Sequence, residues 1–197
     1  GATATWRAPQ DGATVAGGLS VEMVADGVTI EAAGEARQGF GHFHVIVDDG
    51  CVEAGATVPR DVNHLHFGTG STTGLIYLEP GEHELCLQVA NGEHSALDVT
   101  DTATVTVAIR TEDEWCAVVG EVDALFTQAD TGGEEFVVRQ VIYGNVRRLM
   151  AQLTDGLDVV DADARDTVAA AIETGSQISA AFADAADEHA ADEVLEE

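Results

Sequence analysis

The spacing of apolar residues changes near Arg110, and this change constrains the fold more than any other feature of the sequence. Before Arg110, apolar residues recur at every second position in short runs, as in strands with one buried face. After Arg110 they recur every three or four positions, which is the period of an amphipathic helix. We therefore expect a β domain over residues 1–110 and a helical domain over residues 111–197.

The first domain contains several apolar runs of alternating period, separated by turn signals. The runs contain Val21 and Met23; Phe43, Val45 and Val47; Leu65 and Phe67; Leu85, Leu87 and Val89; and Ala103, Val105, Val107 and Ile109. Turn dipeptides such as Pro80-Gly81 and Asn91-Gly92 lie between them. About seven short antiparallel strands in a domain of this size indicate an immunoglobulin-like β-sandwich.

The second domain shows three helical stripes, and Thr111 with Glu114 has the spacing of a capping box at the first helix start. The stripes are Trp115, Val118, Val122 and Leu125; Val138, Ile142, Val146, Leu149 and Leu153; and Val168, Ile172, Gly175, Ile178 and Phe182. They predict an antiparallel three-helix bundle, so the fold class is mainly β plus α. Residues 184–197 are rich in Ala and acids and are expected to extend the third helix or form an acidic tail.

The charge of the chain excludes one large class of partner. The sequence has 36 Asp and Glu against 8 basic residues, all arginine, for a net charge of −28. With so few cations to displace counterions, we expect no nucleic-acid binding. Such acidity is typical of halophilic proteins and of surfaces that stay soluble outside the cell, and both origins remain open. No run of about 18 apolar residues predicts a transmembrane segment.

The three cysteines allow at most one disulfide. Cys51 and Cys86 are the expected pair, which would indicate an oxidising, extracytoplasmic compartment, either secreted, periplasmic or at the cell surface. Cys86 shares the parity of Glu84 and Gln88, so we expect a bridge on the outer face or sheet edge rather than in the core. Cys116, beside an aromatic residue at a helix start, is expected to be a buried small hydrophobic residue.

Six of the seven histidines lie between residues 42 and 94, and four of them form two His-x-His units. Residues two apart on a strand project to one face, and paired strands bring opposed side chains within about 5.5 Å. If the two strands pair in register, four imidazoles converge. Imidazole nitrogen is a ligand for copper and zinc. The candidate metal residues are His42, His44, His64, His66, His83 and His94.

The parity of the strands also suggests where these side chains lie. Phe43 and Val45 alternate with His42 and His44, so we expect the histidines on the outer face, opposite the core. The plainer alternative, that they are exposed or hydrogen-bond neighbouring loops, stays open. His83 has the parity of the buried leucines that follow it, which favours a structural role, and the position of His94 after a turn fixes neither role.

Several sequence blocks resemble a known family. They are PQDGATV at residues 9–15, AAG at 32–34, GHFHVIVD at 41–48, HLHFGTG at 64–70 and LEPGEHEL at 78–85. Over about residues 9–107 they resemble the uncharacterised secreted family called domain of unknown function 4399. Phe43 stands where that family more often has a third histidine, and Thr69 where it more often has lysine. The resemblance implies an extracytoplasmic all-β domain without an established activity, and it does not extend to the helical region.

Three functions are compatible with these features. One is a non-catalytic extracytoplasmic protein that binds copper or zinc through its histidines. A second is an acidic adhesion or scaffold module that self-associates or docks a protein partner. The third is a copper redox metalloenzyme, which would need an open coordination position. The sequence shows no convincing acid–base pair beside the histidines, so we favour binding over catalysis.

Overall fold

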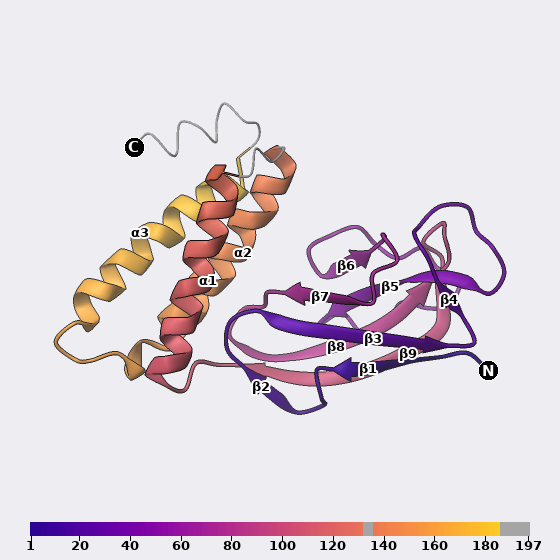
Figure 1. Ribbon diagram of the computed structural model, residues 1–197, viewed down its shortest axis with the longest axis horizontal. Helices are drawn as coiled ribbons and strands as arrows, with labels where there is room; N and C mark the ends of the chain where they lie inside the picture. The colour runs from indigo at the N-terminus through magenta and orange to yellow at the C-terminus, as the bar shows by residue number, and fades with distance from the viewer. Residues whose placement is uncertain (132–135, 186–197) are drawn as a thin grey trace. The chain divides into compact units, whose positions relative to one another are not determined.

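The computed structural model describes residues 1–131 and 136–185, and along this described chain strands precede helices (Figure 1). The strands are β1 (Thr3–Ala8), β2 (Ala13–Val15), β3 (Leu19–Asp26), β4 (Thr29–Ile30), β5 (Phe40–Val47), β6 (His64–Phe67), β7 (Thr73–Ile76), β8 (Gly81–Ala90) and β9 (Ala96–Val107). The helices are α1 (Glu112–Thr131), α2 (Phe136–Asp155), the 3₁₀ turn η1 (Leu157–Val159) and α3 (Arg165–Ala183). Most of the expected acidic tail lies outside the described residues.

The strands form two sheets, as a β-sandwich requires. The smaller sheet has the order β1-β3-β7, and the larger has the order β2-β9-β8-β5-β4, with β6 also paired to β5. Strand β5 therefore has β8 on one side and both β6 and β4 on the other. Both β6 and β8 run antiparallel to β5, whereas the two-residue β4 pairs with it in parallel. The predicted class of a β-sandwich followed by helices is confirmed, with the parallel pairing of β4 and β5 as an addition.

The central strand β5 is buried on both of its faces. Phe43 and Val45 are fully buried, as their alternation with polar residues predicts, and Leu85 and Leu87 of the neighbouring β8 are buried with them. The side chains between them on β5 are also buried, up to Val47 at the strand end. This second buried face carries the histidines discussed below.

The chain forms two compact units that do not divide at a single residue. The sandwich unit comprises Gly1–Thr14, Ser20–Ile76 and Glu82–Thr106. The helical unit comprises Val15–Leu19, Tyr77–Gly81 and the chain from Val107 onward.

The side chain of Gln152 explains why two short segments belong with the helices. Its Oε1 accepts the Gly17 N–H at 2.8 Å, and its Nε2 donates to the carbonyls of Gly17 at 3.2 Å and Leu78 at 2.9 Å. Because Gln152 is only 1% exposed, these bonds satisfy polar groups that water does not reach. One buried amide therefore ties both segments into the helical unit.

The helices begin and pack largely as the sequence indicates. The Thr111 Oγ1 accepts the N–H of Glu114 at 3.1 Å, which confirms the predicted start of α1. Val146 and Leu149 of α2 are fully buried in the helical core. Two expectations are wrong: Val138, in the first turn of α2, is 40% exposed, and Cys116 is exposed on α1. No helix among the described residues is long and apolar enough to cross a membrane.

Candidate metal centre

Strand β5 places two histidines on one buried face of the larger sheet. His42 and His44 are two residues apart, so both side chains project to the face opposite Phe43. On the neighbouring strand β8, Ala90 lies opposite His42 and Gln88 lies opposite His44. His42 is 0% exposed and His44 is 2% exposed, so the expectation that they lie on an outer face is wrong.

The histidines are buried because a covering segment, residues 51–60, lies over this face. Cys86 of β8 projects from this face of the sheet and forms a disulfide with Cys51 of the covering segment, with the two Cα atoms 5.4 Å apart. The side chain of Gln88 accepts the Val52 N–H at 2.9 Å and donates to the Val52 carbonyl at 2.8 Å. An alternating pattern along a strand cannot reveal a loop that covers its polar face, so the alternation predicted exposed histidines here.

The far end of the covering segment is also fixed. Val58 is 1% exposed and packs in a small apolar cluster with Ala90 and Ala96. Its N–H donates to the carbonyl of His94 at 2.9 Å, and the Ala96 N–H donates to the carbonyl of Ala56 at 2.8 Å. The segment is therefore attached at one end to β8 and at the other to the start of β9.

A third histidine comes from β6 and a fourth from a turn. His66 lies directly opposite His44 in the β5–β6 pairing, and their ring centroids are 5.1 Å apart. His94 lies between β8 and β9, where its backbone has a φ of 68° and its N–H donates to the Asn91 carbonyl at 3.0 Å. The Asn91 Oδ1 accepts the Ser95 N–H at 3.0 Å, which holds the turn that presents His94.

The four imidazoles converge on one point. The Nε2 atoms of His42 and His44 are 3.0 Å apart, and those of His66 and His94 are 3.1 Å apart. One ligand atom from each of the four lies within 4.8 Å of all the others. Metal–nitrogen bonds of about 2.0–2.1 Å place tetrahedral ligand atoms about 3.3 Å apart, so small adjustments would suit a single ion. This histidine cluster could hold a metal ion.

Two other candidate histidines lie outside this cluster. The Nδ1 of His64 is 2.7 Å from the Oδ1 of Asp61, and the Nδ1 of His83 is 2.7 Å from the Oδ2 of Asp48. His64 lies opposite Ile46 in the strand pairing, two residue pairs beyond the one that places His66 opposite His44. The converging set therefore contains His94 in place of His64.

Burial and repulsion from neighbouring charges favour the neutral forms of His42, His44 and His66. Burial, with further contributions from His66 and His94, lowers the pKa of His42 to about 4. Burial, followed by the other histidines, lowers the pKa of His44 to about 3. The pKa of His66 is lowered by burial, then by His94 and by the charge of Arg60. The lone pairs that a metal requires are therefore available at neutral pH.

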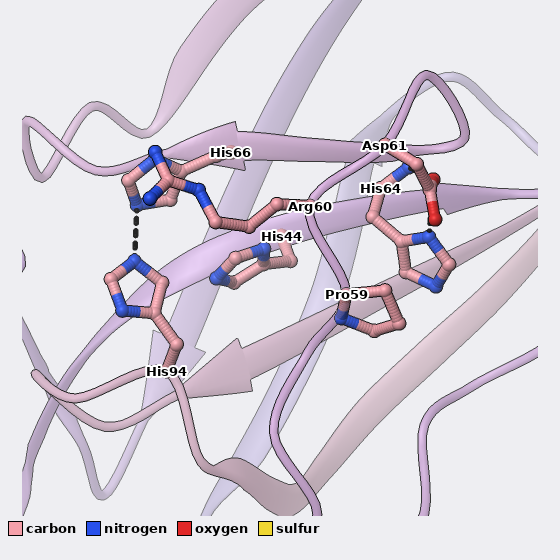
Figure 2. A pocket seen from close by; sticks show the side chains of 7 residues that line it. All are labelled: His44, Pro59, Arg60, Asp61, His64, His66 and His94. Atoms are coloured by element: carbon pink, nitrogen blue, oxygen red, sulfur yellow. Dashed lines mark hydrogen bonds and ion pairs between the residues drawn. The ribbon is translucent and has the colours of Figure 1, made fainter.

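The cluster borders a cavity of about 280 Å³ that sequence reasoning did not find (Figure 2). Its lining consists of His44, Pro59, Arg60, Asp61, His64, His66 and His94. The end of the covering segment contributes one wall of this cavity. No motif marks Arg60 or Asp61 in the sequence, because their position depends on how the covering segment folds back over the sheet.

Comparison with known proteins identifies the family that the sandwich unit resembles. Residues 21–109 match the model of a domain of unknown function, DUF4399, and the helical region matches no family. The resemblance seen in the sequence is thus confirmed. No curated protein matches the sequence. A solved structure described as fibronectin(III)-like modules of Clostridium thermocellum CbhA has a TM-score of 0.31 and 13% identity, covering 53% of this chain and 95% of that one.

The lowered histidine pKa values predict how pH changes the stability of the metal-free protein. Above pH 6.5, His44 is neutral in both the folded and unfolded states and contributes no pH dependence. As pH falls below 6.5, the unfolded state takes up a proton that the folded state refuses until about pH 3, so stability is lost across this window. Urea unfolding in the presence of chelator should show that the free energy of unfolding falls less across this pH window in His44→Phe than in the parent protein. An equal fall in both proteins would mean that His44 does not cause the pH dependence of stability.

The covering segment predicts a second effect. Replacing both bridged cysteines, Cys51→Ala with Cys86→Ala, opens a loop with a sequence separation of 35 and should lower the free energy of unfolding by roughly 3–4 kcal/mol. It should also weaken Zn²⁺ binding, because the cover that buries His42 and His44 is released at one end. Thermal unfolding and calorimetric titration measure the two effects. The matched control Cys116→Ala, at an exposed thiol, should change neither, and unaltered Zn²⁺ affinity in the double variant would show that the cover does not support the cluster.

Proposed function

We propose that this protein is an extracytoplasmic, non-catalytic binding protein that holds one copper or zinc ion in its sandwich unit. The ligands are His42, His44, His66 and His94. The observation that carries the proposal is the convergence of four imidazole nitrogens within 4.8 Å of one another. Neutral imidazole is a favoured ligand of both metals, whereas a hard cation such as Mg²⁺ prefers oxygen.

Burial of two imidazoles supports metal binding over a purely structural role. A buried polar group is costly unless it finds a partner, and in the described protein the Nδ1 atoms of His42 and His44 have no hydrogen-bond partner. Each neutral ring carries one proton, so the hydrogen bond between their Nε2 atoms can use the proton of one ring only. A metal ion would engage both Nε2 lone pairs at once. An ion would thus satisfy the Nε2 atoms of both buried rings, whereas their Nδ1 atoms would stay without a partner.

The same unpartnered atoms favour an exchangeable ion over a permanent one. Metal-bound histidines usually donate their second N–H to a carboxylate or carbonyl, and loss of such a partner costs about 10–100-fold in affinity. His42 and His44 lack that support at Nδ1. His66 is exposed, so one side of the cluster is open to entry and exit. These features suit a carrier or buffer of metal ions.

The proposed compartment rests on the disulfide. A bridge between Cys51 and Cys86 is compatible with an oxidising environment, since cytosolic thiols are kept reduced. The acidic surface, with a net charge of −28, would also concentrate cations around the protein. Secretion, a periplasmic location and cell-surface display all fit this proposal equally.

The test compares histidines inside and outside the cluster. We expect untagged, metal-depleted protein carrying Cys116→Ala, which removes the exposed thiol, to bind one equivalent of Cu²⁺ or Zn²⁺ in calorimetric titration. Adding His94→Ala should weaken binding by about 100-fold or more, because it removes a ligand. The matched control His83→Ala should stay close to the parent, because the structure places His83 with Asp48 instead.

Two results would contradict the proposal. One is the absence of binding in the parent protein, and the other is unchanged affinity in both His94→Ala and the double variant His42→Ala/His44→Ala. Far-UV circular dichroism in chelator shows whether each variant is folded. Loss of binding in a variant that has kept its fold assigns the ligand.

A further inference from the structure

Arg60 has no ion pair among the residues that the structure describes, although the chain has an excess of acids. The sequence contains 36 acidic residues against 8 arginines. Other arginines form ion pairs with acids: Arg37 pairs with Glu31, and Arg110 pairs with Glu114. Within the described residues, Arg60 forms no ion pair and no hydrogen bond, although Asp61 follows it directly in the sequence. A guanidinium left without an acid in such a protein is available to an anion from outside.

Arg60 lies beside the histidine cluster. It lines the cavity of about 280 Å³ together with His44, His66 and His94. Figure 2 shows its side chain extending across the cavity toward His66, and its charge contributes to the lowered pKa of that histidine. An ion held by the cluster would therefore share this cavity with a guanidinium group.

The acid in the same cavity is already engaged. The Asp61 Oδ1 is 2.7 Å from the Nδ1 of His64 and accepts the backbone N–H groups of Asn63 at 3.0 Å and His64 at 3.2 Å. These bonds lower the pKa of Asp61 and hold its carboxylate toward its own loop. Asp61 thus orders the loop that carries Arg60 and does not neutralise the guanidinium.

We propose that this cavity is a subsite for a small anion that binds the metal ion as an additional ligand while pairing with Arg60. This inference rests on the proposed metal site. Small carboxylates and compact inorganic anions match it, because a cavity of about 280 Å³ lies just below the usual range for larger organic ligands, about 300–1,000 Å³. Arginine suits this role because its planar donors pair with carboxylate-like groups in a fixed geometry. The metal and Arg60 together select negative charge.

The test uses azide as the probe anion on Cu²⁺-loaded protein in the Cys116→Ala background. Azide that binds Cu²⁺ produces a charge-transfer absorption band, which gives its affinity by titration. Arg60→Gln should bind azide about tenfold more weakly, because a charge-assisted contact is lost. Its affinity for Cu²⁺ should be unchanged or higher, since removal of a neighbouring positive charge relieves repulsion. A variant with a damaged metal site would instead lose affinity for both azide and Cu²⁺.

Two controls separate this effect from general changes in charge or geometry. Arg7→Gln removes an exposed arginine from β1, outside the cavity lining, and should leave azide binding unchanged. Imidazole, a neutral ligand of Cu²⁺, should bind the parent and Arg60→Gln equally well.

The outcomes separate this proposal from the one on which it rests. Failure of the parent protein to bind Cu²⁺ would overturn both. Tight Cu²⁺ binding without an azide band, or with equal azide affinity in Arg60→Gln, would overturn the anion subsite alone. A selective loss of azide affinity in Arg60→Gln, with Cu²⁺ affinity retained, would support it.

Discussion

Burial of His42 and His44 beneath the covering segment is the constraint on which the candidate metal centre depends. Both residues project from the central strand of the larger sheet, where they would otherwise be solvated side chains with ordinary pKa values. Residues 51–60 close over them, attached by the disulfide at one end and by the apolar contacts of Val58 at the other. Exclusion of water lowers their pKa values and keeps their nitrogen lone pairs free.

The cover also determines what surrounds the cluster. Arg60 at its end, and Asp61 directly after it, line the cavity together with His66 and His94. The same segment therefore covers His42 and His44, carries one end of the disulfide, and contributes Arg60 to the lining of the cavity.

The sequence predicts the architecture better than the site. Alternation of Phe43 and Val45 with polar residues is a direct consequence of strand geometry, so the strands and the shared face of His42 and His44 could be read from it. The contribution of His94 could not, because it depends on the conformation of the turn between β8 and β9, where His94 has a positive φ. The position of His64 could not be predicted either, because it depends on the pairing register, which places His64 opposite Ile46 rather than a histidine. Tertiary contacts of the covering segment leave no periodic signal at all.

The number and kind of atoms around the bound metal test the central claim most directly. X-ray absorption spectroscopy of the protein loaded with one equivalent of Cu²⁺ or Zn²⁺ reports both. Convergence of the four histidines predicts a first shell with four nitrogen ligands at about 2.0 Å and the multiple scattering of imidazole rings beyond it. A shell dominated by oxygen, or one with fewer than three imidazoles, would contradict a metal site built from His42, His44, His66 and His94.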